Sequence, residues 1–200
     1  MPYAPNVVVL AGPNGAGKST TGPALLRDTL GITEFVNADT IAQGLSAFDP
    51  AGSAVGAGRV MLGRMHELAQ RRADFAFETT LAGRASAAWL TGLREEGYRV
   101  HVVFLWLPSA DLAVDRVAGR FRMGGHDVRE DVIRRRYHRG LRNFFALYQS
   151  LADSWRVYDN SDINGPRLIA TGSRTRTARV ADEATWQQIQ EEWGHDRQDR

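Results

Sequence analysis

The clearest chemical signature in this sequence lies in one short segment near its N-terminus, residues 12–20, which we call the phosphate loop. Its residues GPNGAGKST match the spacing G-x-x-x-x-G-K-[S/T]. In this pattern glycines let backbone N–H groups converge on phosphate oxygens, and the positive end of the following helix adds to the attraction. Lys18 is expected to reach the β- and γ-phosphates, and the Ser19 hydroxyl to bind Mg²⁺. The residues expected to bind ATP or GTP are Gly12, Pro13, Asn14, Gly15, Ala16, Gly17, Lys18, Ser19 and Thr20.

Two carboxylates follow apolar segments further along the chain. Asp39 comes after FVNA, and Glu78 comes directly after FAF. A kinase that acts on a hydroxyl needs a carboxylate to accept the proton and direct the oxygen at the γ-phosphate. Asp39 could instead cap a helix, since aspartate is common at that position. Glu78 does not fit a cap, and its burial would be costly unless it is paired or bound to a ligand.

Arginine dominates the cationic residues, because Lys18 is the only lysine among 25 Lys and Arg residues. Arginines that cover the triphosphate can stabilise charge that develops on the γ-phosphate. Nine arginines lie in the segment 116–142: 116, 120, 122, 129, 134, 135, 136, 139 and 142. We predict an arginine-rich lid over about residues 116–136, hinged at the Met-Gly-Gly sequence 123–125. Arg120 and Arg122 are the first candidates and Arg129 and Arg135 the next; a solvated helix face explains most of the others.

The elements that must position these residues alternate between strands and helices. Apolar runs predict strands at residues 6–10, 34–37, 75–77, 99–107 and 155–158. Helical spacing predicts helices at residues 18–30, 52–72, 85–96, 111–120 and from 129 to about 151, and residues 39–49 are expected to be loop or irregular helix. A hairpin (167–171 and 178–180) and a last helix follow. This order predicts an α/β three-layer sandwich with a five-stranded, mainly parallel sheet, in which ligands bind beyond the carboxyl ends of the strands.

Composition sets the broad class of the protein. The chain has 200 residues, 43% apolar content, a formal net charge of +2 and no cysteine. These values fit one domain, which we place at residues 1–193, followed by a polar tail at 194–200. The small net charge does not predict nucleic-acid or membrane binding, and neither a signal peptide nor a membrane-spanning run is recognisable. We therefore expect a cytoplasmic protein.

Other classes of nucleotide-binding protein fit less well. The longest apolar strand ends in Leu107-Pro108 without the carboxylate that motor and transporter ATPases require, and no LSGGQ-like signature is present. GTPases use an NKxD-type motif for guanine, and this chain has no lysine outside the phosphate loop. What remains is a compact kinase-like protein with a mobile lid.

Five segments in this order resemble the zeta-toxin-like kinases: GPNGAGKST, FVNADTIAQ, FAFETTLAGR, RVAGRFRMGGHDVREDVIRRRY and VYDNS. The resemblance spans about residues 6–161. It implies a P-loop NTPase of nucleotide-kinase type that phosphorylates a sugar hydroxyl of UDP-N-acetylglucosamine with ATP or GTP. It implies Asp39 as the catalytic aspartate, Glu78 and Thr80 as substrate contacts, Arg84 as the counterpart of a nearby family arginine, and an antitoxin protein as partner.

Three functions remain open on the sequence alone. The first is a small-molecule kinase with Asp39 as the base and a sugar nucleotide as first-choice acceptor. The second is a polynucleotide 5′-hydroxyl kinase, motivated by the arginine-rich segment 129–142, whose binding would weaken steeply with salt. The third is a nucleotide-gated binding module with only slow hydrolysis, which would bind ATP without forming a phosphorylated product.

Overall fold

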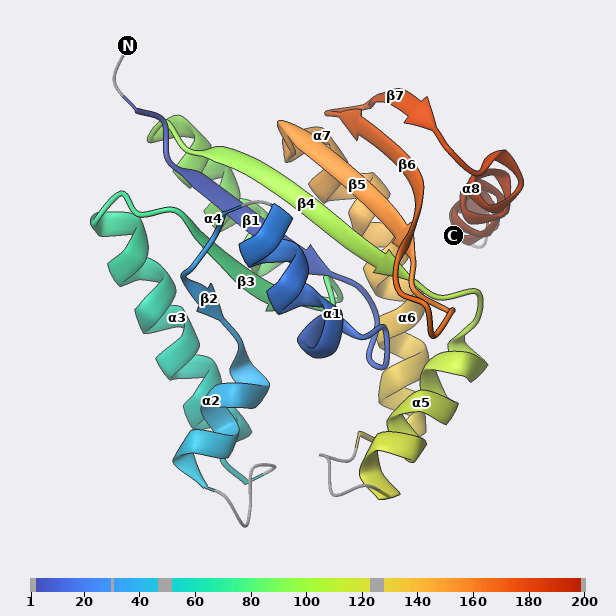
Figure 1. Ribbon diagram of the computed structural model, residues 1–200, viewed down its shortest axis with the longest axis horizontal. Coiled ribbons are helices and arrows are strands. Elements are labelled where there is room, and N and C mark those ends of the chain that lie inside the picture. The colour runs from blue at the N-terminus through green and yellow to red at the C-terminus, as the bar shows by residue number, and fades with distance from the viewer. Residues whose placement is uncertain (1–2, 30, 47–51, 123–127, 199–200) are drawn as a thin grey trace.

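The computed structural model describes residues 3–29, 31–46, 52–122 and 128–198 (Figure 1). Its strands are β1 (Asn6–Ala11), β2 (Phe35–Val36), β3 (Phe75–Thr79), β4 (Arg99–Trp106), β5 (Ser154–Asp159), β6 (Arg167–Ser173) and β7 (Arg176–Val180). Its helices are α1 (Lys18–Ala24), α2 (Ala38–Leu45), α3 (Ala54–Gln70), α4 (Ala85–Glu95), α5 (Ala110–Arg122), α6 (Glu130–Asn143), α7 (Gln149–Leu151) and α8 (Glu183–Gln198), with π-helical turns η1 (Leu25–Thr29) and η2 (Phe144–Tyr148).

The strands form one sheet in the order β2-β3-β1-β4-β5-β6-β7. The first five strands of this order pair in parallel, and β6 and β7 pair antiparallel to β5 and to each other. The predicted α/β class and the five parallel strands are confirmed. The hairpin, however, is not a separate unit: it extends the sheet to seven strands, because β6 satisfies the backbone groups on the free edge of β5.

Alternation along the strands divides the core between the two faces of the sheet. Val7, Val9, Phe75 and Phe77 point to one face, where α3, α4, the α6–η2 segment and α8 pack. Leu10 points to the opposite face, where α1, η1 and α5 pack. Figure 1 shows α1 in front of the sheet and α6 behind it. Each face is therefore covered by helices, as a parallel sheet requires.

Several element boundaries differ from the sequence-based prediction. The first helix changes from α to π geometry at Leu25, two residues after Pro23, which has no N–H to continue the ladder. The long helix predicted after Arg129 also changes from α to π geometry, at Phe144, where no proline is present. Residues 38–45 form the regular helix α2 rather than an irregular segment. Helix α8 continues through Gln198, beyond the predicted start of the polar tail at residue 194.

Candidate functional site

A cavity of about 400 Å³ lies beyond the carboxyl ends of β1, β3 and β5. The phosphate loop and the start of α1 form one wall, and α5 and the loop after β5 form another. Asp39 and Glu78 lie on its third side. The cavity therefore lies where the sheet topology predicts a ligand site.

The phosphate loop is held in its shape by close backbone packing. Gly12 has φ 140°, and a Cβ at this position would lie 2.3 Å from the carbonyl oxygen of Leu105. Gly17 has φ 79°, and a Cβ there would lie 2.5 Å from the side-chain nitrogen of Asn160. Since neither position has room for a side chain in this conformation, the glycines of the motif are structural requirements of the loop.

Lys18 is the first residue of α1, and its ammonium group folds back over the phosphate loop. Nζ donates hydrogen bonds to the carbonyl oxygens of Gly12 and Pro13, both at 2.7 Å, and lies 3.7 Å from Oε1 of Glu78. The side chain is only 5% exposed. Burial lowers the pKa of Lys18, and the negative charges of Glu78 and Asp39 oppose this effect.

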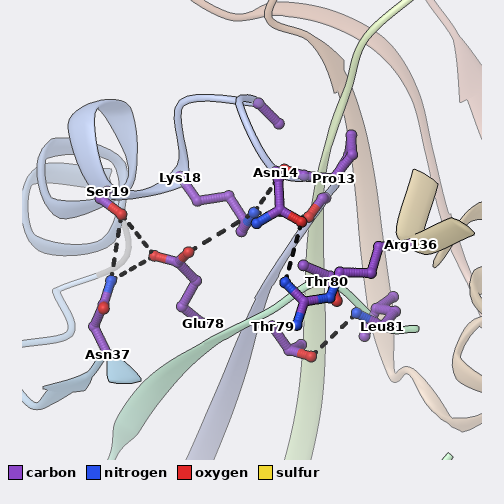
Figure 2. A network of polar contacts seen from close by, with 12 residues as sticks. Pro13, Asn14, Lys18, Ser19, Asn37, Glu78, Thr79, Thr80, Leu81 and Arg136 are labelled. Carbon is purple, nitrogen blue, oxygen red and sulfur yellow. Dashed lines mark hydrogen bonds and ion pairs between the residues drawn. The ribbon is translucent and has the colours of Figure 1, made fainter. Parts of the chain in front are cut away.

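Glu78 is the centre of a polar network that joins three elements (Figure 2). Its Oε2 accepts hydrogen bonds from the Ser19 hydroxyl at 3.1 Å and from the Asn37 side-chain amide at 2.5 Å. Its side chain is 14% exposed, and the pairing explains how a carboxylate can be tolerated there. Strand β3 continues to Thr79, so Glu78 lies inside the strand rather than after it, on the face that carries α1.

Asn37, and not Asp39, is the cap of α2. Its side-chain oxygen accepts a hydrogen bond from the backbone N–H of Thr40 at 3.0 Å. The interpretation of Asp39 as a helix cap is therefore wrong. Asp39 lies in the first turn of α2 and is exposed, with its carboxylate on the wall of the cavity. Asn37 belongs to the FVNADTIAQ segment, but its contact with Glu78 is not predictable from the spacing of the residues.

The arginines divide into those that face the cavity and those that do not. Arg116 and Arg120 of α5 line it. Arg136 of α6 approaches the phosphate loop, with Nη1 3.4 Å from the side-chain oxygen of Asn14 (Figure 2). Arg122 and Arg135 are exposed, and neither is among the residues that line the cavity.

Arg129 is also exposed, and it pairs with Asp131 at 3.0 Å. The glycine hinge proposed within the lid falls in residues 123–127, which lie outside the described residues. The helix phase therefore places Arg136 toward the phosphate loop in preference to its neighbour Arg135.

The loop after β5 fastens the far wall of the cavity to the phosphate loop. The Asn160 side chain donates to the carbonyl oxygen of Ala16 at 2.8 Å. Arg116 donates to the carbonyl oxygens of Asn160 at 2.7 Å and Ser161 at 2.6 Å. Ile163 on the same loop is 98% exposed and lies at the mouth of the cavity. The residue pattern of this loop does not predict such a role, although its first residues belong to the VYDNS segment.

The loop after β3, which carries Thr80, is braced from behind by α6 and η2. Gly140 lies so close that a Cβ there would be 2.3 Å from the carbonyl oxygen of Thr80. The Asn143 side chain donates to the carbonyl oxygen of Leu81 at 2.7 Å, and Leu81 has the left-handed φ of 56°. Such a backbone persists only where its surroundings enforce it. Arg84, at the start of α4, is exposed and does not line the cavity.

Comparison with known proteins agrees with this geometry. Residues 7–147 match the model of a family described as AAA domain. An uncharacterized protein of Haemophilus influenzae is 28% identical over 130 residues, which cover 65% of this chain and 91% of the relative.

Two solved structures have a similar fold. One is the AvrRxo1-ORF1:AvrRxo1-ORF2 complex with sulphate ions, with a TM-score of 0.70 and 16% identity over 94% of this chain. This chain spans 64% of the length of that one. The other belongs to the PezAT toxin–antitoxin system of Streptococcus pneumoniae, with a TM-score of 0.66, 14% identity and coverage of 95% of this chain and 84% of that chain. At these identities the likeness establishes a P-loop kinase-like fold.

Among the described residues, no helix is both long and apolar enough to cross a membrane.

Proposed function

The chain belongs to the AAA domain family, and we propose that it is a kinase that transfers the γ-phosphoryl group of ATP or GTP to a hydroxyl of a small molecule. The observation that carries this proposal is the meeting of Lys18, Asp39 and Glu78 at one cavity. A nucleotide-binding module that only hydrolyses slowly does not need a second, exposed carboxylate beside the triphosphate.

The phosphate loop fits a triphosphate. The Lys18 ammonium is held by loop carbonyls, within reach of phosphates placed over the loop, and the first turn of α1 presents its free N–H groups to the same place. We place the adenine or guanine ring of the nucleotide at the end of the cavity that Arg116 and the exposed Ile163 line.

Ser19 and Glu78 fit a magnesium site. The Ser19 hydroxyl lies 3.1 Å from Oε2 of Glu78, so two hard oxygen donors face the same place. The described residues contain no group of three or more His, Cys, Asp or Glu side chains that could hold a metal by themselves. Mg²⁺ in kinases takes few protein ligands and completes its shell with phosphates and water, so Ser19 and Glu78 would be sufficient on the side of the protein. When bound, Mg²⁺ would neutralise charge on the phosphates.

Asp39 is the proposed general base. Its carboxylate is exposed on the cavity wall, on the same side as Glu78, where an acceptor hydroxyl can reach it. It accepts the proton as the hydroxyl oxygen attacks the γ-phosphorus, and the bond from this phosphorus to the β–γ bridging oxygen breaks to release ADP or GDP. Arg120 and Arg136 lie around the phosphate loop and contribute positive charge that stabilises the γ-phosphate oxygens during transfer.

The finer assignment follows from the resemblance to the zeta-toxin-like kinases. We propose UDP-N-acetylglucosamine as the first acceptor to test, with Thr80, in the loop that follows β3, as a residue that contacts it. The PezAT structure comes from a toxin–antitoxin system, and on this basis we also propose that an antitoxin protein binds this chain.

The test uses matched variants and a panel of acceptors. Wild-type protein, Asp39→Asn and Lys18→Ala are incubated with γ-labelled ATP or GTP and a pool that contains sugar nucleotides, small alcohols and a 5′-hydroxyl oligonucleotide. Mass spectrometry identifies the phosphorylated species. We expect Asp39→Asn to lower product formation by about 10²–10⁴-fold with nearly unchanged nucleotide affinity, and Lys18→Ala to weaken nucleotide binding itself.

Unchanged turnover in Asp39→Asn would refute the assignment of the base. Label on the oligonucleotide alone would select the polynucleotide kinase, and tight ATP binding without any labelled acceptor would favour a binding module.

A further inference from the structure

A second polar cluster lies at the opposite edge of the sheet, near the amino ends of β1, β4 and β5. Ser154 and His101 are direct neighbours across β5 and β4, and the Ser154 hydroxyl lies 2.7 Å from Nδ1 of His101. Nε2 of His101 lies 3.0 Å from the side-chain oxygen of Asn6. The Asn6 amide nitrogen in turn lies 3.1 Å from Oδ1 of Asp74. The four side chains form a single chain of hydrogen bonds, which we call the amino-edge relay.

The contacts fix where the protons of the relay are. Asp74 can only accept as a carboxylate, so the Asn6 amide nitrogen faces it and the Asn6 oxygen faces His101. Nε2 of His101 must then carry the hydrogen that it donates to Asn6. In the neutral ring Nδ1 is left with a free electron pair, and it accepts the hydrogen of the Ser154 hydroxyl.

The neutral form of this ring is favoured by its surroundings. Burial lowers the pKa of His101, and Arg156 and Arg99 act in the same direction, whereas Asp153 and Asp74 oppose them. The Asp74 carboxylate is also occupied by the backbone N–H of Asn6 at 2.6 Å and by the hydroxyl of Tyr3. Asp74 therefore orients Asn6, and Asn6 orients the imidazole of His101. As a result, Nδ1 of His101 is available as a base beside the Ser154 hydroxyl.

The relay opens into a cavity of about 270 Å³ that is separate from the nucleotide cavity. Ser154, His101, Asn6 and Asp74 line it, with Val8 and Val103 as apolar floor. Arg156, two residues along β5 and on the same face as Ser154, also lines it. Figure 1 shows that α1 lies in front of the sheet nearer the carboxyl end of β1, so the amino ends of β1 and β4 extend beyond it.

A hydroxyl, an imidazole that accepts its hydrogen and a third group that orients the imidazole form the arrangement of a nucleophile activated by a general base. We propose that Ser154 is an acyl-accepting nucleophile, with His101 as its general base, and that the cavity takes a small ester. Asn6 and Asp74 act as positioning residues, and the Arg156 guanidinium is placed to stabilise negative charge on the carbonyl oxygen.

The reaction balances without any cofactor. Oγ of Ser154 attacks the carbonyl carbon of the ester, and its proton passes to Nδ1 of His101. The bond from this carbon to the leaving oxygen breaks, and the imidazolium returns the proton to that oxygen to release an alcohol. Water then attacks the acyl-serine by the same route, which releases the acid and regenerates the hydroxyl.

The test is covalent labelling of the full chain with a fluorophosphonate probe and acylation by p-nitrophenyl acetate. The adduct is located by peptide mass spectrometry. The variants are Ser154→Ala and His101→Gln, with Ser173→Ala and His138→Gln as controls, because Ser173 and His138 are exposed and lie outside the relay. Gln at position 101 retains a donor for Asn6 but offers no base. Fluorescent-ATP binding checks that each variant is folded.

We expect the adduct on Ser154, no adduct in Ser154→Ala, and labelling slowed by about 10²-fold or more in His101→Gln. The two controls, Ser173→Ala and His138→Gln, should label at the wild-type rate. The labelling rate should rise with pH through a midpoint below the ordinary histidine value, since the neutral ring is the base. An unlabelled Ser154, or labelling of His101→Gln at the wild-type rate, would overturn the proposal.

Discussion

The two edges of one sheet carry polar groups of different character. At the carboxyl edge, Lys18, Glu78 and Asp39 bring charges of both signs to one cavity. At the amino edge, a relay that is neutral except at Asp74 joins three adjacent strands. The difference follows from the direction of the chain. Parallel strands lead from their carboxyl ends into helix N-termini, whose free N–H groups favour anionic ligands, whereas no such groups meet at the amino ends. Charged side chains that suit a phosphate ligand are therefore found at the carboxyl edge, whereas the side chains of the relay at the amino edge interact mainly through hydrogen bonds.

Apart from the loss of the proposed general base, the largest effect is expected from two neighbouring arginines at the carboxyl edge, which should differ from each other. Arg136→Ala should slow phosphoryl transfer by about 10²-fold, because it removes positive charge beside the phosphate loop. Arg135→Ala should leave the rate near wild type, since Arg135 is exposed and outside the cavity. Single-turnover transfer from γ-labelled ATP measures both. Equal rates in the two variants would contradict the placement of Arg136, and neither variant should alter labelling of Ser154.

A smaller effect, on the stability of the fold, is expected where α6 packs against the loop that follows β3. Gly140→Ala should destabilise the fold by about 1–3 kcal/mol, because the new Cβ would press on the carbonyl of Thr80. Gly92→Ala, also within a helix but with nothing within 4 Å of the new Cβ, should stabilise it by about 0.5–1 kcal/mol. Urea unfolding gives both values. If both substitutions changed the free energy of unfolding in the same direction, α6 would not pack tightly against the loop after β3.

The smallest effect is expected at the amino edge and depends on pH. Burial lowers the pKa of His101 in the folded chain, so the unfolded chain takes up the proton first as the pH falls. The stability that the neutral His101 ring contributes is therefore complete above pH 6.5, the ordinary histidine value. It is lost as the pH falls from there through the lower pKa of the folded chain. The urea midpoint of the wild type should fall more between pH 7.5 and 5.0 than that of His101→Gln. Parallel curves for the two proteins would place His101 in a solvated, unperturbed site.

The sequence determined the parts of this protein that depend on neighbouring residues. The phosphate loop is one contiguous motif, so its glycines, Lys18 and Ser19 could be located from spacing alone. The alternation of apolar runs and helical periods was sufficient for the α/β class and the five parallel strands, because one face of each strand and helix must be buried. Asp39 and Glu78 were found at the edge because parallel strands end on the same side.

The tertiary structure alone decided which distant residues meet. Arg136, rather than Arg122 or Arg135, faces the phosphate loop because the docking of α6 sets its rotation. Asn160 is 144 residues from Ala16, and His101 is 53 from Ser154. Such pairs depend on strand order and register, which a periodic pattern does not encode, since the same alternation is compatible with many orders.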